Sequence, residues 1–296
     1  MAGGYDVRAL HPDLFEGVEA TSARRVVSNF GSDAHEGRQA SRRDVELAVL
    51  LATKRISPHQ FQDRALAELG LFGFDAPDLI TGAELFDATY PDFSSTLYPL
   101  GEEGGVPVMR NAWGIRDGTM LQQVEYVLAE RARDSIQTGE IAIERTYDLA
   151  HARRMHAAMF AELYPNWAGA VRPHGLVKGP HAFAQPNQID NYWRNATEAI
   201  RNADLPALPR REFVTTAAYV YANINQAHFG REGNGRTGKL FLEQVAEITA
   251  FELDYSRIGP GLWNERSKSS RPDPGYLAVR QASLVTVFDQ ITVDAG

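Results

Sequence analysis

One short stretch in the last third of the chain gathers side chains that could act on phosphate. Residues 228–239 read HFGREGNGRTGK, with glycines and an asparagine between one histidine and two downstream cations, Arg236 and Lys239. Glycine-rich backbone can turn successive N–H groups toward an anion. A helix beginning near Thr237 would add its free N–H groups and its dipole. The stretch therefore predicts an anion-binding loop.

The other polar residues of this stretch suit phosphoryl or nucleotidyl transfer. Glu232 stands among the donors, where a carboxylate is unfavourable for phosphate unless a cation such as Mg²⁺ lies between them. His228 could act as a general base near neutral pH. The alternative is a loop that simply turns the chain, with His228 as a cation at a helix end. That alternative is favoured for any single residue, whereas the complete set in this order favours a transfer site.

A competing motif overlaps the same loop. Residues 233–239, GNGRTGK, match G-x-x-x-x-G-K, the beginning of a phosphate-binding P-loop. The next residue is Leu240, whereas a P-loop has Ser or Thr there to hold Mg²⁺, and the preceding segment is helical where a P-loop follows a strand. The sequence therefore argues against a P-loop.

Helices are expected to position this loop. Apolar residues recur at steps of three and four in RREFVTTAAYVYANINQAH, and the same period restarts after the glycines. Ser41 and Ser57 each precede a helical pattern as expected N-caps, and Pro58 suits a first helical position. Alternating strand patterns are few, so an all-α or mostly α fold is predicted.

The chain divides into three regions by composition. Residues 5–69 are helical and arginine-rich, residues 70–93 form a loop-rich connector, and residues 94–285 hold the long helices and the glycine loop. A chain of 296 residues is long enough to bury a substantial core.

Composition narrows the class of protein. Apolar residues make up 44% and charged residues 23%, which is typical of soluble globular proteins. The formal charge of −8 argues against nucleic acid or membrane partners. The lack of cysteine excludes disulfides and thiolate chemistry. The longest apolar block, LAVLL, is too short to span a bilayer, and the first residues lack a signal-peptide core. We expect a cytoplasmic protein; a bacterial source, with delivery into a target cell left open, is implied only by the family resemblance described next.

The glycine stretch resembles the Fic family. Its motif H-x-F-x-(D/E)-G-N-G-R-x-x-R matches HFGREGNGRTGK in register at most positions. Upstream, WAGAVR at 167–172 resembles the family's W-A-G-x-x-R, and KGPHAFAQPNQI at 178–189 resembles its flap. The resemblance covers residues 94–260 and implies a Fic-type helical core with a short β-hairpin flap, preceded by a small helical inhibitory region.

The resemblance implies adenylylation, the transfer of AMP from ATP to a Ser, Thr or Tyr hydroxyl of a target protein. His228 would take the proton of the hydroxyl, and Glu232 would hold Mg²⁺. ATP phosphates would be bound by Gly233, Asn234, Gly235, Arg236 and Lys239. The flap would hold the target by strand addition, with Lys178, Phe183 and Ile189 as its candidate contacts. For Phe183, packing within the flap is the alternative.

Three positions depart from the family pattern. The expected phenylalanine of the motif falls on Gly230, one place after Phe229, so either Phe229 fills the same hole or the loop is less firmly held. The last arginine is Lys239, which cannot form a bidentate fork. The aromatic before Trp167 is displaced to Tyr164. A transferase using another nucleotide or phosphate donor, or a catalytically weak nucleotide-binding module, therefore stays open.

Residues 32–37, SDAHEG, resemble the short inhibition motif (S/T)-x-x-x-E-(G/N) carried by Fic proteins or their antitoxin partners. A capped, solvated helix face is the alternative for this motif of Ser32, Glu36 and Gly37. If it is inhibitory, Glu36 would pair with Lys239 at the γ-phosphate position, and Ser32 would hydrogen-bond within the site. The target protein and any homo-oligomer stay open.

Overall fold

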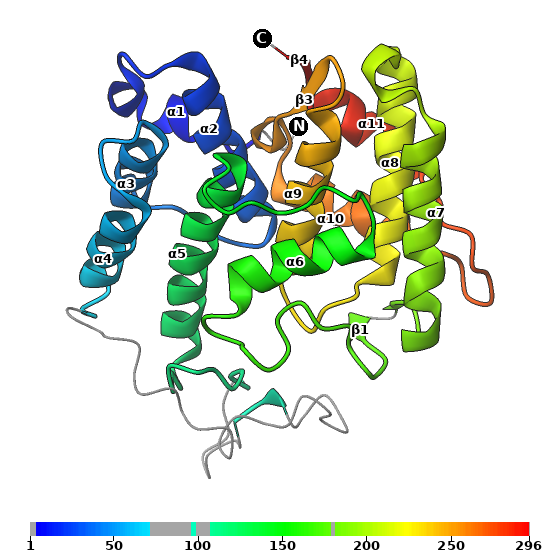
Figure 1. Ribbon diagram of the computed structural model, residues 1–296, viewed down its shortest axis with the longest axis horizontal. Helices are drawn as coiled ribbons and strands as arrows, with labels where there is room; N and C mark the ends of the chain where they lie inside the picture. The colour runs from blue at the N-terminus through cyan, green and yellow to red at the C-terminus, as the bar shows by residue number, and fades with distance from the viewer. Residues whose placement is uncertain (1–3, 72–95, 99–106, 179–180, 296) are drawn as a thin grey trace.

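Two consecutive helices, α8 (Arg210–Ala227) and α9 (Asn234–Ala246), hold the glycine loop between them (Figure 1). They belong to a mostly helical fold, as the sequence predicts. The computed structural model describes residues 4–71, 96–98, 107–178 and 181–295. Most of the predicted connector, 70–93, lies outside these residues.

The helices around α9 bury the core of the molecule. They are α2 (Ala20–His35), α5 (Gly118–Gln137), α6 (Leu149–Phe160), α7 (Ile189–Asn202), α10 (Pro260–Ser269) and α11 (Ala282–Ile291). Helices α7 and α8 lie side by side, α6 packs on α5 and α9, and α2 runs past α9 (Figure 1). Large core side chains exposed by 2% or less include Trp167, Phe213, Phe241, Trp263 and Phe288. Burying such side chains is the main drive for folding and holds α9 firmly in place.

The N-terminal helices join this core. They are α1 (Val7–Leu10), α2, α3 (Arg42–Ala52) and α4 (Pro58–Glu68). Ser41 and Ser57 cap α3 and α4 through reciprocal capping boxes, and Pro58 is the first residue of α4, so these predictions are confirmed. Phe30 of α2 and Val45 of α3 form a local cluster, whereas Phe61 of α4 belongs to the main core.

The predicted flap is a β-hairpin of β1 (Val177–Lys178) and β2 (His181–Ala182), paired antiparallel. A second small sheet, β3 (Phe251–Leu253) with β4 (Thr292–Asp294), was not predicted. Strands of three residues are too short to produce a clear alternation. Short 3-10 turns join the helices at Pro12–Phe15, Pro186–Gln188, Leu205–Ala207 and Tyr255–Arg257.

Some element boundaries differ from the expected ones. The pattern IERTYDLAHARRMHAAMFAELY suggests one long helix, but α6 begins only at Leu149, because Asp148 caps it by accepting from the His151 N–H at 3.1 Å. Helix α9 begins at Asn234 rather than near Thr237. The packed core continues through α11 to Ile291, beyond the expected boundary at 285.

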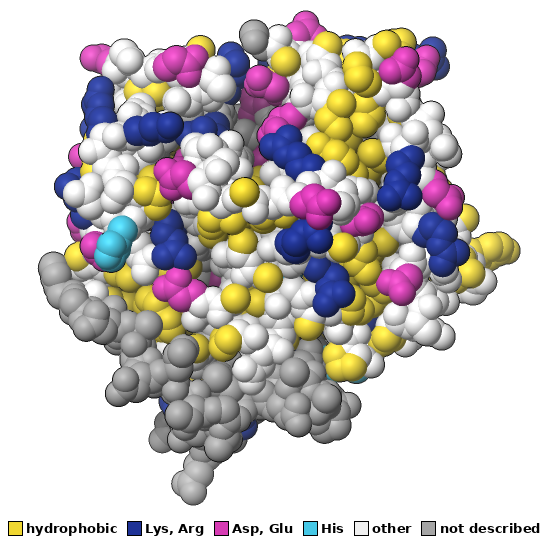
Figure 2. Space-filling model, viewed as in Figure 1, with side chains coloured by type: hydrophobic (Ala, Val, Ile, Leu, Met, Phe, Trp, Pro, Cys, Tyr) yellow, Lys and Arg dark blue, Asp and Glu magenta, His cyan; other side chains and the backbone are white. Residues whose placement is uncertain are grey.

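The surface shows mixed charge. On the face drawn in Figure 2, basic and acidic side chains of the described residues are interspersed rather than gathered by sign. Within the described part of the chain, no helix is both long enough and apolar enough to cross a bilayer.

Candidate active site

A cavity of about 730 Å³ opens at the start of α9. Its lining includes Glu36, Glu125, Lys178, Glu232, Gly235 and Arg236. These residues come from the C-terminal cap of α2, from α5, β1, the glycine loop and α9, so distant parts of the chain meet here. The volume lies in the range of small-molecule and cofactor sites.

The glycine loop owes its shape to two residues with left-handed backbone. His228 ends α8 with φ of 42°, and Gly233 precedes α9 with φ of 76°. A Cβ on Gly233 would lie 2.5 Å from the Phe160 ring, so only glycine fits there. Phe229, exposed by 3%, packs against His156 and Trp193. Phe229 therefore fills a core position beside the loop.

Asn234 closes the loop from within. Its side-chain Nδ2 donates to the Gly230 carbonyl at 2.9 Å, and its Oδ1 accepts from the Gly230 N–H at 2.8 Å. Both ends of the amide are thus occupied by the loop backbone. What Asn234 offers an anion in this structure is its backbone N–H, not the side chain expected from the sequence.

The first turn of α9 carries backbone N–H groups that have no acceptor within the helix. Gly235 leaves this turn open to an anion, and the carboxylate of Glu36 already lies against it. A Cβ at Gly235 would be only 2.2 Å from Glu36 Oε1. The predicted anion-binding loop therefore faces an acidic side chain of the same chain.

Arg236 lies beside the same cavity with only 7% of the residue exposed. It forms an ion pair with Glu125 of α5. The rings of Phe160 and Tyr126 lie 4.7 Å and 5.3 Å from its guanidinium carbon. Burial would lower the pKa of Arg236, but Glu125 outweighs it and raises the pKa, so the guanidinium stays charged.

Glu232 presents a carboxylate to the cavity. Burial, followed by the charge of Glu125, raises its pKa despite the opposing charge of Arg236. The Glu232 carbonyl accepts from Nε2 of His156 at 2.7 Å, while His156 Nδ1 accepts from the Gly169 N–H at 2.9 Å. Accepting at Nδ1 requires the neutral tautomer protonated at Nε2, and burial agrees by lowering the pKa of His156 to about 4. His156 thus anchors the backbone that carries Glu232.

His228 lies next to the cavity under the flap. Its ring stacks on Phe183 with centroids 3.7 Å apart and 13° between the planes. Among described residues it is not part of the cavity lining, although its side chain is partly exposed. Burial, joined by the charges of Arg271 and Arg172, lowers the pKa of His228 to about 3. The imidazole is therefore neutral at physiological pH and able to accept a proton.

Arg172 joins the flap to the glycine loop. Its Nε donates to the His228 carbonyl at 2.7 Å, and Nη2 donates to the carbonyls of Ala184 and Ala227 at 2.5 Å and 3.2 Å. These bonds give the arginine of the WAGAVR segment a structural role. The flap base and the end of α8 are held as one unit.

The three flap residues named from the sequence lie in different surroundings. Lys178 is exposed and lines the cavity. Phe183 is 3% exposed, with His228 on one side and the Arg271 guanidinium 3.9 Å from its ring centroid. Ile189 has no exposure and begins α7. Only Lys178 presents its side chain outward, so Phe183 and Ile189 pack rather than reach toward a target in this structure.

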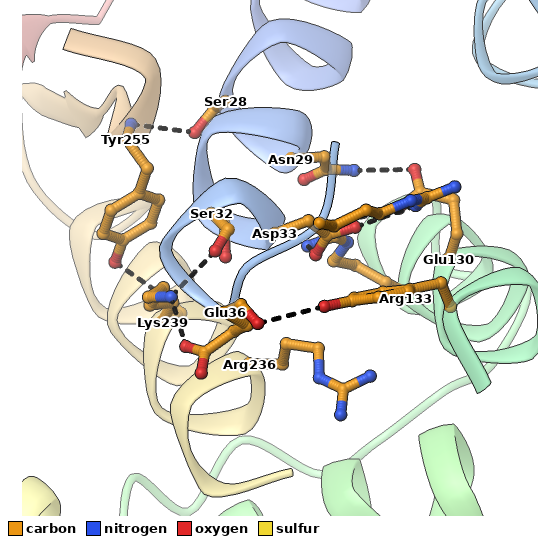
Figure 3. Close-up of polar contacts among 12 residues, drawn as sticks. Ser28, Asn29, Ser32, Asp33, Glu36, Glu130, Arg133, Arg236, Lys239 and Tyr255 are labelled. Carbon is orange, nitrogen blue, oxygen red and sulfur yellow. Dashed lines mark hydrogen bonds and ion pairs between the residues drawn. The ribbon is translucent and has the colours of Figure 1, made fainter. Parts of the chain in front are cut away.

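The expected pairing of Glu36 with Lys239 is present (Figure 3). Lys239 Nζ donates to Glu36 Oε1 at 2.7 Å and to the Ser32 carbonyl at 2.9 Å. The Ser32 hydroxyl is buried without a hydrogen-bond partner in the described residues, so Ser32 contributes its backbone rather than the side chain that the sequence suggested. Gly37 follows with φ of 94°, which turns the chain away after α2.

The pair is charged on both sides. Burial alone would raise the pKa of Glu36, but the charge and hydrogen bond of Lys239 lower it to about 2. Burial lowers the pKa of Lys239, which is 1% exposed, and Glu36 counteracts that loss. The ammonium and the carboxylate therefore depend on each other to remain charged.

Helix α2 is held by buried contacts before it reaches the site. Asp33 accepts from Arg133 of α5 and from Arg38 at 3.1 Å and 3.0 Å (Figure 3 labels Asp33 and Arg133). Gly31 lies against the backbone of Ser256, where a Cβ would be 2.3 Å from the Ser256 nitrogen. The packing of the whole helix therefore fixes the position of Glu36.

Sequence reasoning missed the residues that support the site from α5. Glu125 and Tyr126 lie in MLQQVEYVLAERARDSI, where they read as part of an ordinary helix. Glu125 pairs with Arg236, and the Tyr126 hydroxyl donates to the Glu36 carbonyl at 3.3 Å. Arg271, which lies over Phe183, was also missed. No local motif marks partners that lie 90 residues away, as for Tyr126, or 111 residues away, as for Glu125.

Known proteins share this sequence pattern. Residues 146–246 match the Fic/DOC family. The protein adenylyltransferase VbhT of Bartonella schoenbuchensis is 34% identical over 51% of this chain and 31% of its own length. The probable protein adenylyltransferase y4lH of Sinorhizobium fredii is 32% identical over 53% of this chain and 79% of its own length. The chain thus spans about a third of VbhT but most of y4lH.

Solved structures share the fold. BepC of Bartonella tribocorum, with bound AMPPNP, superposes with a TM-score of 0.56 at 20% identity, covering 67% of this chain and 97% of that one. A Fic domain from Bartonella quintana with bound ADP gives 0.55 at 22% identity, covering 63% of this chain and 91% of that one. Helix, loop and helix around residues 228–239, together with these relatives, establish that the chain belongs to the Fic/DOC family and is related to protein adenylyltransferases.

Proposed function

We propose that this protein transfers AMP from ATP to a Ser, Thr or Tyr hydroxyl of a target protein. The observation that carries the proposal is the cavity at the start of α9, where free backbone N–H groups, the Arg236 guanidinium and the Glu232 carboxylate meet beside a neutral His228. The adenylyltransferase relatives, and the nucleotides bound in the structural neighbours, support the same chemistry.

In this proposal His228 accepts the proton of the target hydroxyl. The oxygen forms a bond to the α-phosphorus of ATP, the bond from that phosphorus to the bridging oxygen breaks, and pyrophosphate leaves. The low pKa of His228 keeps its imidazole unprotonated before the reaction. Because Phe183 covers one face of the ring, the hydroxyl would approach at the ring edge. Arg236 would stabilise the charge that develops on pyrophosphate.

Glu232 suits a magnesium ion shared with the phosphates of ATP. Mg²⁺ in nucleotide sites is held by one or two carboxylates and by the phosphates rather than by a complete protein cage. When bound, Mg²⁺ would neutralise phosphate charge, and Glu232 would determine where the ion lies.

The flap would hold the target through its main chain. Val177, on β1, is 65% exposed, and Lys178 beside it is also on the surface. A target segment could add as a strand to this edge, which gives main-chain hydrogen bonds without demanding one sequence. Lys178 would then lie between the target and the phosphates.

We further propose that the Ser32–Gly37 segment restrains this activity. Glu36 occupies Lys239 and lies against Gly235, so its carboxylate takes up a position suited to a terminal phosphate. A nucleotide would have to displace Glu36 or bind with its phosphates in an unproductive arrangement. Because the inhibitor and the site share one chain, the effective concentration is high.

Labelled ATP tests both proposals. The purified chain, its Glu36→Gly variant and a Glu36→Gly/His228→Ala variant are incubated with Mg²⁺ and ATP labelled at either the α- or the γ-phosphate. We expect protein labelling from α-labelled ATP alone, strongest in Glu36→Gly and lost with His228→Ala. Labelling from γ-labelled ATP would overturn AMP transfer in favour of another phosphate transfer. Nucleotide binding without labelling would favour a nucleotide-binding module.

A further inference from the structure

A buried carboxylate on α5 lies directly beside Arg236. Glu125 and Arg236 are each 7% exposed and form an ion pair. A carboxylate is rarely buried unless its charge is compensated. The ion pair has no role in the reaction as described above, in which Arg236 acts only on the departing pyrophosphate.

The second oxygen of Glu125 is also occupied. Oε2 accepts from the Tyr164 hydroxyl at 2.6 Å. Tyr164 is 1% exposed and stacks on Trp167 with centroids 4.4 Å apart and 19° between the planes. A rigid stack therefore fixes the tyrosine hydroxyl, and the hydroxyl and Arg236 together fix both oxygens of the carboxylate.

One terminal nitrogen of the Arg236 guanidinium takes no part in the ion pair. Nη2 pairs with Glu125, while Nη1 is buried without a hydrogen-bond partner in the described residues. An unsatisfied buried donor is costly unless a ligand completes it. Since Arg236 lines the cavity, an anion bound there could complete this buried nitrogen.

We infer that Glu125, fixed by Tyr164, is a positioning residue that holds the Arg236 guanidinium with Nη1 free for the pyrophosphate portion of the nucleotide. The displaced aromatic of the sequence pattern, Tyr164 rather than a residue two before Trp167, thereby gains a role. The inference rests on the proposed function, because it assigns a partner to the arginine of that site.

Substitution of Glu125 should impair the orientation of the Arg236 guanidinium. Glu125→Gln keeps the shape but removes the charge that opposes Arg236, so the guanidinium is no longer held in one orientation. Tyr164→Phe removes one hydroxyl and leaves the ion pair. Tyr192→Phe is the matched control, because its hydroxyl donates one hydrogen bond, at 2.9 Å to the Leu277 carbonyl, away from the cavity.

Two measurements in the Glu36→Gly background test the inference. The first is the affinity for inorganic pyrophosphate with Mg²⁺ by calorimetry; the second is the rate constant of self-labelling with its half-saturating ATP concentration. For Glu125→Gln we expect pyrophosphate affinity to fall about tenfold and the rate about 10- to 100-fold, with half-saturating ATP within roughly threefold. Tyr164→Phe should show the same pattern at roughly threefold, and Tyr192→Phe none.

The double variant Glu125→Gln/Tyr164→Phe separates positioning from general packing. If Tyr164 acts through Glu125, the double variant matches Glu125→Gln alone, whereas independent effects multiply. Multiplying effects would overturn the inference. If Glu125→Gln does not fold, parental pyrophosphate affinity and rate in Tyr164→Phe would overturn it instead. An absence of α-label transfer in the parent would instead overturn the proposed function, and pyrophosphate affinity would still test Glu125.

Discussion

Two carboxylates from different parts of the chain pair with neighbouring cations of α9. Glu36, at the end of α2, pairs with Lys239, and Glu125, in the middle of α5, pairs with Arg236. The Glu36 side chain is 30% exposed and uses one oxygen for its partner. Glu125 is almost completely buried and uses both oxygens.

The difference predicts that the Glu36 contact opens and the Glu125 contact stays closed. Glu36 follows the last residue of a helix and its side chain is 30% exposed, so in our proposal a phosphate replaces it without unpacking the core. Glu125 is enclosed by Tyr164 and Arg236, and removing it leaves a buried charge without its partner. We therefore expect opposite signs: loss of Glu36 raises activity, and loss of Glu125 lowers it.

Comparing the two ion pairs is useful only if both affect the same reaction. The His228→Ala variant tests whether the measured labelling is that reaction, and we expect it to have the largest effect. In the Glu36→Gly background we expect self-labelling to fall by about 10²- to 10⁴-fold, because a general base typically contributes that much. Autoradiography with α-labelled ATP measures it. Retained labelling would mean that the imidazole stacked on Phe183 is not the base.

The Glu36→Gly variant tests the Glu36–Lys239 pair. A charge-assisted hydrogen bond to a buried group is worth about 1.5–3 kcal/mol. Removing it should raise the initial rate of self-labelling about 10- to 100-fold at fixed ATP. Rates that remain equal across a wide range of ATP concentrations would show that Glu36 does not compete with the nucleotide.

The Tyr126→Phe variant tests the backbone contact that holds Glu36 and leaves its carboxylate unchanged. The variant removes the hydrogen bond from the tyrosine hydroxyl to the Glu36 carbonyl, and it keeps the ring beside Arg236. One neutral hydrogen bond contributes about 0.5–1.5 kcal/mol, so self-labelling should rise roughly 2- to 10-fold. A fall in rate would indicate that the hydroxyl supports the active site and not the proposed inhibitory segment.

The smallest effect concerns stability against pH. The pKa of Glu36 is lowered to about 2 in the fold, from an ordinary value of 4.5. A carboxyl whose folded pKa is lowered stabilises the fold above its unfolded pKa, and this contribution is lost as pH falls toward the folded value. Wild type should therefore melt about 2–4 °C above Glu36→Gln near pH 6, and the gap should close between pH 4.5 and 2. Thermal melts across this range measure it.

Much of the site was predictable because the glycine loop is local. Its glycines, asparagine and flanking helices lie within a dozen residues, and backbone rules act over that distance. The pairing of Glu36 with Lys239 was also expected, because a short motif marks each partner. The hydrogen bonds of the Asn234 amide were not expected. Their partner is the backbone of Gly230, and a backbone partner cannot be recognised from the amino-acid sequence.

The sequence by itself determined the helix–loop–helix, its capped neighbours and the set of side chains suited to phosphate, since these follow from local propensity and spacing. Only the tertiary structure decided that Phe183 covers His228, that Glu125 and Tyr164 hold Arg236, and that the Ser32 hydroxyl lies unpaired beside Lys239. Those arrangements join residues from segments that lie far apart in the sequence. Their geometry is set by how the core packs, which no single segment encodes.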